Sequence, residues 1–256
     1  MTYETVTYEL SSGVATVTLN RPEALNSFNP AMCADFAALW AAVRADEDVR
    51  CVVLRAAGEH FSTGLDVKAG RGPGSESPWL VEDPGEQLSP KRNKVWKPVV
   101  CAVQGMCAGG AFYWINESDL LICSEEATFF DPHCTYGMTS ALEPIGMRDR
   151  MPLGEVLRMV LLGLDERMSA STALRVGLVS EVVARERLWD RAAELATLIA
   201  AKPPWSVQGS VKAIWEALDL PRSIALQRGM TYPQLTKLTQ GPAARSGRKP
   251  DSWVLR

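Results

Sequence analysis

The sequence predicts an α/β fold in a single domain, in which apolar strands alternate with amphipathic helices. Short apolar runs at 51–54 and 99–103 are each followed by a glycine-containing turn and then by helix-like residues. This alternation is expected of parallel βαβ units. The chain has 256 residues, of which 46% are hydrophobic, enough for one sizeable core without a second folding unit.

The elements follow in order along the chain. Two alternating strands are expected at 5–10 and 14–20, joined by a tight turn at 11–13. A helix is expected from about residue 29, because apolar residues then recur at three- and four-residue spacing. These residues are Met32, Phe36, Leu39, Trp40 and Val43. Beyond the strands at 50–54 and 99–103, helical patterns dominate from residue 147. The helices expected there are 156–162, 186–200 and 206–218, with a break at Pro203-Pro204.

Composition argues against several kinds of partner. A formal net charge of −3, without a long run of Lys or Arg, argues against nucleic acid and against an acidic membrane surface as partners.

The six cysteines lack metal-ligand spacing, so we expect no metal site. Several lie in apolar runs, such as Cys51, Cys101 and Cys107, and are interpreted as buried thiols in a reducing compartment. Because the first residues lack a signal-peptide pattern and no apolar run reaches membrane-spanning length, we expect a cytoplasmic protein.

The most informative stretch is 98–111, where an apolar strand runs into Gly109-Gly110 and continues as helix-like residues. Backbone N–H groups at the start of a helix favour negative charge. A second glycine turn, at 58–68, follows the strand at 51–55. Two such turns on neighbouring strands can direct two N–H donors at one carbonyl oxygen, which is the arrangement of an oxyanion hole.

These segments resemble the crotonase (enoyl-CoA hydratase/isomerase) superfamily. The pattern F-S-x-G-x-D-x-K stands at 61–68 and K-P-V-x-x-A-x-x-G-x-x-x-G-G stands at 97–110. The early loop at 19–27, the strand at Asp119 and the segment 169–179 follow the family order. The resemblance implies a crotonase (ClpP-like) fold of repeated ββα units with a helical C-terminal trimerisation region. One domain, 1–256, would then contain a core with the CoA and active sites at 1–190 and a helical region at 191–256.

The resemblance also implies the chemistry of the site. A CoA thioester carbonyl would lie between the backbone N–H groups of Leu65 and Gly110, where an enolate or tetrahedral anion is stabilised. CoA enters as part of the substrate, and no permanently bound cofactor is implied. Arg21 and Lys68 would neutralise phosphate. The CoA contacts implied are Arg21, Ala24, Leu25, Asp66 and Lys68.

Two positions depart from the pattern of the family hydratases. Those enzymes carry a glutamate three residues after the oxyanion glycine and another 20 residues further on. Here Tyr113 and His133 occupy these positions (133 − 113 = 20). Water addition uses one carboxylate to activate water and another to handle the α-proton, so the reaction does not follow from the resemblance. His133 is the predicted base, because an imidazole is competent near neutral pH. Tyr113 either donates a hydrogen bond to substrate, orients His133, or narrows the pocket as an aromatic plug.

Other acidic residues are candidates for the missing carboxylates. Glu143, ten residues past His133 (143 − 133 = 10), is the preferred partner of the histidine, because the resemblance places isomerase and hydrolase carboxylates in this region. Asp131 precedes the turn that holds His133. Glu117 lies four residues after Tyr113, one helical turn along the same face, but is better interpreted as a surface or capping residue.

Three further features complete the expectations. His60 is expected to be a solvent-facing turn residue. The interval 69–93 lacks apolar periodicity and is expected to be a mobile loop, in which Trp79 and Leu80 either contact substrate or have no role. The segment 245–250 resembles the family's C-terminal tail, which reaches a neighbouring subunit's CoA, and is otherwise a solvated basic tail.

Three functional hypotheses remain. The first is an acyl-CoA enzyme of the crotonase superfamily, a hydratase/isomerase-like lyase or isomerase that uses Tyr113 and His133 in place of the glutamates. The second is a carbon–carbon hydrolase of the β-diketone type, in which His133 activates water. The third is a catalytically silent acyl-CoA binder. The first is preferred because the CoA-contact motifs are kept. Family members form trimers or dimers of trimers, so we expect the helical C-terminal third, rich in Leu and Met at 147–164, to bury such an interface.

Overall fold

The predicted α/β fold is present in the computed structural model, which describes residues 2–69 and 83–240. Within these residues, a main sheet has the strand order β1-β2-β3-β4-β6-β9 and a small sheet has the order β5-β7-β8. The strands of the main sheet are β1 (Val6–Ser11), β2 (Val14–Leu19), β3 (Cys51–Ala56), β4 (Val99–Val103), β6 (Leu120–Ser124) and β9 (Glu181–Val183). The strands of the small sheet are β5 (Met106–Ala108), β7 (Thr128–Phe130) and β8 (Met168–Ser169).

The first two strands pair antiparallel, and every later neighbour in the main sheet is parallel. Because β3 and β4 are adjacent, the two glycine turns that follow them leave the same edge of the sheet. The helices are α1 (Pro30–Ala45), α2 (Gly85–Leu88), α3 (Phe112–Ile115), α4 (Leu142–Met147), α5 (Leu153–Leu162), α6 (Ala170–Val176), α7 (Leu188–Ala200), α8 (Pro204–Leu218), α9 (Arg222–Gly229) and α10 (Thr231–Gln240).

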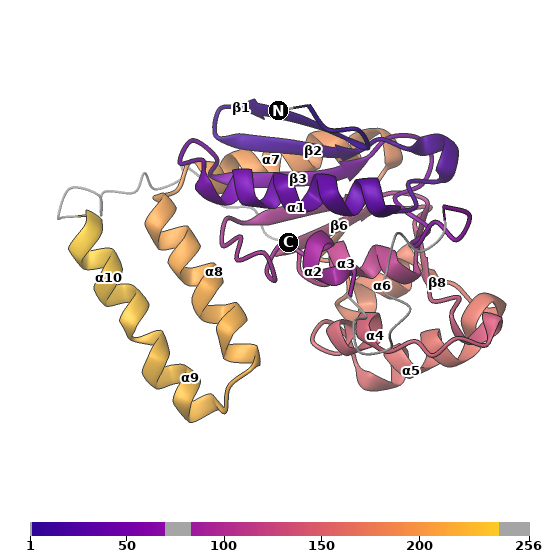
Figure 1. Ribbon diagram of the computed structural model, residues 1–256. Coiled ribbons are helices and arrows are strands. Elements are labelled where there is room, and N and C mark those ends of the chain that lie inside the picture. Colours follow the sequence, from indigo (N-terminus) through magenta and orange to yellow (C-terminus); the bar gives the residue numbers. More distant parts are fainter. Residues whose placement is uncertain (1, 70–82, 241–256) are drawn as a thin grey trace, which may run out of the picture.

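Helices cover both faces of the main sheet, with α1 on one side and α7 on the other (Figure 1). Successive residues of β3 alternate between these two layers, as the period of two in a strand requires. Val52 and Leu54 pack in the cluster that contains α1, whereas Cys51 and Val53 pack in the cluster with α7. The central strands are continuous apolar runs because both faces of the sheet are buried. Helix α7 overlaps the segment we assigned to the C-terminal helical region, but it packs against the sheet.

Helix α1 begins where the sequence predicted. The Asn29 side chain accepts a hydrogen bond from the Met32 N–H (2.9 Å), and Pro30 occupies the first turn, which are both favourable at a helix start. On its buried face, the Trp40 indole N–H donates to the Leu88 carbonyl (2.8 Å). Leu88 belongs to α2 and is fully buried. The prediction that all of 69–93 is an unpacked loop is therefore wrong for 85–88, because a long-range contact with α1 orders this segment. Trp79 and Leu80 lie outside the described residues.

Helices α8 to α10 form an arm that extends away from the sheet (Figure 1). Asp119, directly before β6, joins the arm to the body: its carboxylate accepts hydrogen bonds from the Trp215 indole N–H of α8, the Lys91 ammonium and the Val99 N–H, each at 2.7 Å. The Trp215 ring also lies 5.5 Å from the Lys91 Nζ. Lys91 is 8% exposed, so its charge depends on this carboxylate.

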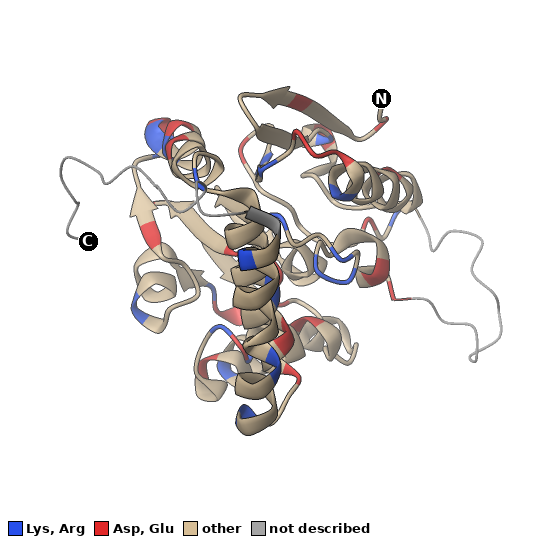
Figure 2. Cartoon of the chain, turned by 90° about the vertical axis from the view of Figure 1, so that its left-hand side faces the viewer, with Lys and Arg blue, Asp and Glu red and all other residues tan. Residues whose placement is uncertain are grey.

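Basic and acidic side chains are interspersed over the chain (Figure 2), in keeping with the small net charge. Across residues 2–69 and 83–240, no helix has both the length and the apolar character needed to span a membrane.

Replacing Asp119 with Asn is expected to lower the free energy of unfolding by about 3 kcal/mol, because the buried Lys91 ammonium loses its partner. Urea denaturation followed by circular dichroism measures the change. Asp190→Asn is the control: its ion pair with Arg187 is exposed, and such pairs contribute only about 0–1 kcal/mol. Equal effects of the two substitutions would contradict the importance of Asp119.

Candidate active site

The two glycine turns run side by side after leaving the sheet. The Phe61 N–H donates to the Gln104 carbonyl (2.8 Å), and the Ser62 N–H donates to the Met106 carbonyl (3.1 Å). The Ala108 N–H donates back to the Ser62 carbonyl (3.0 Å). These hydrogen bonds fix the register of the segment after β3 against β5, which leads into the short 3₁₀ helix η2 (Gly109–Ala111).

The turns come into backbone contact at Gly64 and Gly110. A Cβ atom at Gly64 would lie 2.7 Å from the Gly110 nitrogen and 2.9 Å from the Ala108 oxygen, and Gly64 has a φ of +83°. A Cβ atom at Gly110 would lie 2.4 Å from the Phe28 ring. A side chain at Gly64 would push the two turns apart, and a side chain at Gly110 would collide with the Phe28 ring, so glycine is favoured at both positions.

This contact leaves two backbone donors near each other. The Phe28 N–H donates to the Gly64 carbonyl (2.8 Å), and the Asp66 N–H donates to the Phe28 carbonyl (2.9 Å). Peptide groups alternate in direction along an extended segment, so the Leu65 N–H between them points away from Phe28. The Gly110 N–H lies at the start of η2, where a helix provides no acceptor. Among the described residues neither N–H has a protein acceptor, so both can serve one anionic oxygen.

His133 lies against the glycine pair and is held by Asp131. A Cβ atom at Gly109 would lie 3.5 Å from the His133 Cε1. The imidazole Nδ1 is 2.6 Å from an Asp131 carboxylate oxygen, which also accepts the His133 backbone N–H at 3.0 Å. The other carboxylate oxygen accepts from the Ser140 hydroxyl at 2.6 Å. Because Asp131 is fully buried and can only accept, Nδ1 carries the hydrogen and Nε2 is the basic nitrogen of the neutral ring.

The structure brings Glu143 to this basic nitrogen. The distance from the His133 Nε2 to the Glu143 Oε1 is 4.0 Å, and Glu143 is buried in the first turn of α4. The two residues come from different segments, and the Asn116 side chain fixes the Glu143 backbone by donating to its carbonyl (2.9 Å). An imidazole and a carboxyl group therefore lie close together beside the glycine pair.

Burial and pairing shift the pKa values of this cluster in opposing ways. The hydrogen bond to Asp131 raises the pKa of His133, against the effect of burial. Burial alone would raise the pKa of Asp131, but its hydrogen bonds with His133 and Ser140 outweigh burial and lower it. Burial raises the pKa of Glu143, partly offset by His133. Asp131 is thus kept ionised, whereas protonation of Glu143 is favoured.

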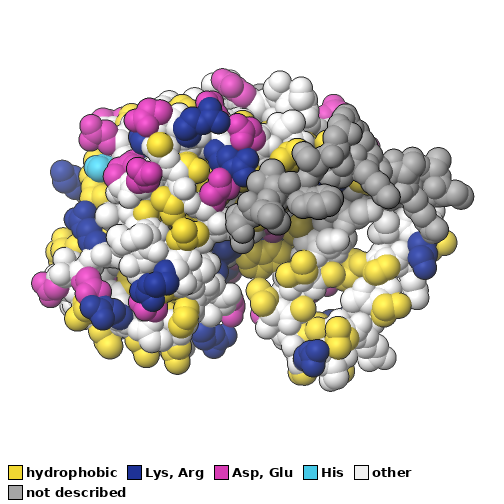
Figure 3. Space-filling model, turned by 180° about the vertical axis from the view of Figure 1, so that it is seen from behind, with side chains coloured by type: hydrophobic (Ala, Val, Ile, Leu, Met, Phe, Trp, Pro, Cys, Tyr) yellow, Lys and Arg dark blue, Asp and Glu magenta, His cyan; other side chains and the backbone are white. Residues whose placement is uncertain are grey.

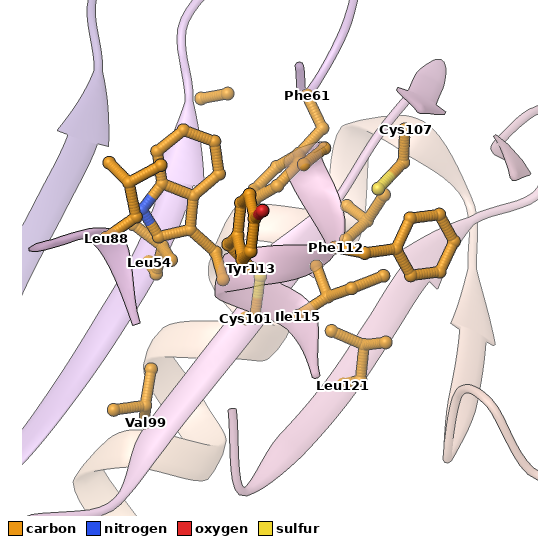
Figure 4. Packing of buried hydrophobic residues seen from close by; sticks show 14 of the residues in the cluster. Leu54, Phe61, Leu88, Val99, Cys101, Cys107, Phe112, Tyr113, Ile115 and Leu121 are labelled. Atoms are coloured by element: carbon orange, nitrogen blue, oxygen red, sulfur yellow. The ribbon is translucent and has the colours of Figure 1, made fainter. Parts of the chain in front are cut away.

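Tyr113 is buried in the short helix that follows the glycine pair. It lies on α3, just after η2, with its ring edge-on to Phe28 at a centroid distance of 6.2 Å, and it packs among the core residues in Figure 4. Burial raises the pKa of Tyr113, with contributions from Glu143 and Asp83, so the phenol is neutral and can donate a hydrogen bond. Asp83 is a residue without a motif or periodicity signal in the sequence.

Two predicted positions differ in the structure. Helix α3 ends at Ile115, so Glu117 does not share a helical face with Tyr113, and that prediction is wrong. Glu117 instead accepts the N–H groups of Lys91 (2.6 Å) and Arg92 (3.0 Å), so it binds the backbone of a turn and does not cap a helix. His60 is half-buried rather than solvent-facing, because its Nδ1 accepts the Met106 N–H at 3.3 Å.

Among the residues predicted to contact CoA, Arg21 and Asp66 form an ion pair. The Arg21 guanidinium lies 3.0 Å from the Asp66 carboxylate and donates to the Ser27 carbonyl (2.6 Å). Part of the Arg21 charge is therefore already balanced, whereas Lys68 is exposed. Ala24 ends the 3₁₀ helix η1 (Pro22–Ala24), and Leu25 follows with a φ of +53°. The segment 245–250 lies outside the described residues.

No cluster of three or more His, Cys, Asp or Glu side chains able to hold a metal ion occurs within residues 2–69 and 83–240. All six cysteines are free, and Cys134 is the exposed one. The titratable side chains gathered near the glycine pair include His133, Glu143 and Asp131.

Comparison with known proteins gives a consistent family. Residues 9–245 match the family described as Enoyl-CoA hydratase/isomerase. The chain is 38% identical to (E)-benzylidenesuccinyl-CoA hydratase of Thauera aromatica, over 90% of this chain and 88% of that one. It is 32% identical to 1,2-epoxyphenylacetyl-CoA isomerase of Escherichia coli, over 80% and 79%. A solved enoyl-CoA hydratase/isomerase from Mycobacterium paratuberculosis superposes with a TM-score of 0.86 at 34% identity, covering 94% of this chain and 92% of that structure.

The substitution Asp131→Asn is expected to lower the pKa of His133 toward its ordinary value of 6.5, because the hydrogen bond to the Asp131 carboxylate is what raises it. The chain has two histidines, so NMR titration of the imidazole resonances resolves each, with His60 as the reference outside the cluster. An unchanged His133 pKa would contradict the pairing.

Proposed function

This chain belongs to the enoyl-CoA hydratase/isomerase family, and from that premise we propose that it transforms an acyl-CoA thioester through an enolate. The backbone N–H groups of Leu65 and Gly110 stabilise the enolate oxygen, and His133 and Glu143 move the protons. The observation that carries this proposal is the position of the His133–Glu143 pair, 4.0 Å apart, directly beside the glycine pair.

The chemistry of the two groups determines which protons each of them accepts or donates. In the neutral form, the His133 Nε2 accepts a proton from the α-carbon, and the electron pair of the broken C–H bond moves toward the thioester oxygen. If the proton comes from water instead, the water oxygen bonds to the β-carbon and the electron pair of the carbon–carbon double bond moves toward the thioester oxygen. Asp131 then stabilises the imidazolium through Nδ1. Glu143, whose protonation burial favours, donates a proton to the carbon that completes the reaction. The two groups thus fill the acid and base roles without a glutamate at position 113 or 133.

Two named relatives support a substrate with an aromatic acyl group. Their names specify a benzylidenesuccinyl and an epoxyphenylacetyl thioester, and in this chain the aromatic rings of Phe28 and Tyr113 pack edge-on beside Gly110. Phenyl-substituted enoyl-CoA esters therefore lead a substrate panel that also contains aliphatic enoyl-CoA, 3-oxoacyl-CoA and CoA-free β-diketones, followed by mass spectrometry. Turnover of β-diketones alone would indicate a carbon–carbon hydrolase, and binding without turnover would indicate a silent acyl-CoA binder.

The substitution His133→Ala is expected to lower kcat on the acyl-CoA substrate about a hundredfold or more, the usual scale of general acid–base catalysis. Affinity for the CoA ester should stay near that of the unmodified protein, because His133 makes no contact in the proposed CoA region. His60→Ala is the matched control, since His60 hydrogen-bonds to Met106 outside the cluster. If both variants retain full kcat, His133 is not the base.

The substitution Gly110→Pro removes one oxyanion donor and is expected to lower kcat about 10²–10³-fold. Gly110→Ala separates this effect from crowding, because it keeps the N–H but meets the same Phe28 ring, which a Cβ atom would approach to 2.4 Å. The alanine variant should retain more activity than the proline variant at equal helix content by circular dichroism. Equal activity of the two folded variants would remove Gly110 from the oxyanion hole.

We also propose that the chain assembles into a homotrimer or a dimer of trimers. Exposed leucines lie along α5, namely Leu153, Leu157 and Leu161. The arm also exposes large apolar side chains, namely Trp205, Ile214, Leu218 and Met230. Figure 3 shows hydrophobic side chains at the surface of both regions. Burial of such faces against further copies would stabilise the assembly.

Light scattering at micromolar concentration is expected to give a mass of three or six chains. Leu157→Glu/Leu161→Glu should shift the protein toward smaller species, because burying two carboxylates in an apolar interface is costly. Leu10→Glu, at the exposed strand β1, is the control for a charge added elsewhere. A monomer for the unmodified chain would contradict the proposed assembly.

A further inference from the structure

The turn that follows α3 is hydrogen-bonded to the backbone of Glu143. The Asn116 side chain, which is 7% exposed, donates from its Nδ2 to the Glu143 carbonyl oxygen at 2.9 Å. Helix α4 passes so close to this amide that a Cβ atom at Gly146 would lie 2.6 Å from the Asn116 Nδ2. The contact joins segments 27 residues apart, and it fixes the first turn of α4, which carries Glu143.

The amide at position 116 is only half satisfied. Its Oδ1 is buried and has no hydrogen-bond partner among the described residues. A buried polar atom without a partner lowers stability, whereas a leucine side chain, which branches in the same way, would carry no such atom. What the amide provides at this position is therefore the hydrogen bond from Nδ2 to Glu143.

Arg150 holds the turn that carries Asn116. Its guanidinium donates from the Nε to the Asn116 carbonyl oxygen at 2.8 Å, and it also donates to the Ser118 carbonyl. Both carbonyls belong to the turn between α3 and β6. On the other side, Trp215 of α8 lies against this guanidinium, with 5.8 Å between the Arg150 Cζ and the ring centroid. A chain of contacts therefore runs from the arm (Figure 1) through Arg150 and Asn116 to Glu143.

We propose that Asn116 is a positioning residue that holds Glu143 against His133, and that Arg150 makes this position depend on the docking of the arm. The inference rests on the proposed function, because it concerns the acid–base pair used there, and it adds the residues that set the geometry of that pair. Asn116 contacts the backbone of Glu143 and not the reacting atoms. A reacting group displaced by about 1 Å can lose about a hundredfold in rate, so a backbone contact of this kind affects the chemistry.

The imidazole of His133 responds to the charge of Glu143. The hydrogen bond to Asp131 is the largest of the effects that raise the pKa of His133, and the Glu143 carboxylate adds to it. Glu143 itself is buried, and the titratable groups that face it are His133, Asp131 and Asp83, together with the Tyr113 phenol. Because an opposite charge acts more strongly at shorter distance, the pKa of His133 reports how close Glu143 lies, and it does so without substrate.

NMR titration of the His133 imidazole tests the contact. Asn116→Leu removes the donor and keeps the branched shape, so Glu143 is released and the pKa of His133 should fall. Glu143→Gln removes the charge itself and should lower this pKa at least as far. The two substitutions combined should give the same pKa as Glu143→Gln alone, because Asn116 acts only through Glu143. Ser118→Ala is the matched control: it removes a 2.9 Å hydrogen bond to the Trp114 carbonyl in the same turn and should leave the pKa of His133 unchanged.

Two substitutions at Trp215 test the dependence on the arm. Trp215→Leu removes the ring from Arg150 and should lower the pKa of His133, with no further fall when it is combined with Asn116→Leu. Trp215→Phe keeps a ring at the guanidinium and loses the indole N–H that binds Asp119, so its His133 pKa should stay closer to that of the unmodified chain. Arg150→Lys, whose single ammonium cannot reach both carbonyls, takes the place of Trp215→Leu if that variant does not fold.

Turnover of an acyl-CoA ester by the same variants gives the second measurement. Asn116→Leu is expected to lower kcat about tenfold or more, with KM changed less than about threefold, whereas Ser118→Ala should keep kcat within about twofold. The proposal is overturned if folded Asn116→Leu keeps the unmodified pKa of His133, if its effect adds to that of Glu143→Gln, or if neither Trp215→Leu nor Arg150→Lys moves that pKa. The expected pKa changes in a chain that turns over no acyl-CoA ester would support the positioning contact and overturn the proposed function alone.

Discussion

The site depends on one backbone contact, the approach of Gly64 to Gly110. A Cβ atom at Gly64 would come within 2.7 Å of the Gly110 nitrogen, so the two turns meet only because neither carries a side chain there. Parallel pairing of β3 with β4 brings the turns to the same edge, and hydrogen bonds from Phe61 and Ser62 set their register. The two N–H donors are then fixed before any ligand arrives, which is the condition under which such donors are effective in catalysis.

Around this contact, acidic groups alternate with the donors that pair with them. Asp131 pairs with His133, which faces Glu143. On the other side Asp83 pairs with Arg92 and, through it, with Glu117. Lys91 and Asp119 continue the series to Trp215 on the arm. Each acceptor faces a donor, because a buried charge without a partner is strongly unfavourable. Glu117, which accepts the Lys91 N–H, thus links Arg92 to the contacts that connect the arm to the body.

The resemblance to the family hydratases predicts glutamates where this chain has Tyr113 and His133. In the structure, Glu143 of α4 lies 4.0 Å from the histidine. Burial, Glu143 and Asp83 raise the pKa of the Tyr113 phenol. An imidazole beside a buried carboxyl group is suited to transferring protons near neutral pH. The proposed proton transfers rest on this pair.

The sequence by itself determined the features that depend on local pattern. The apolar runs predicted the central strands, the spacing of Met32, Phe36 and Trp40 predicted α1, and the glycine pattern predicted the two turns that follow β3 and β4. The tertiary structure alone decided which side chains meet across long separations. No local signal placed Asp83 beside Tyr113, ordered α2 against Trp40, ended α3 before Glu117 or packed α7 on the sheet. Propensity and periodicity act over a few residues, whereas these contacts arise when the sheet and its helices pack, and packing of distant segments has no signature in a single sequence.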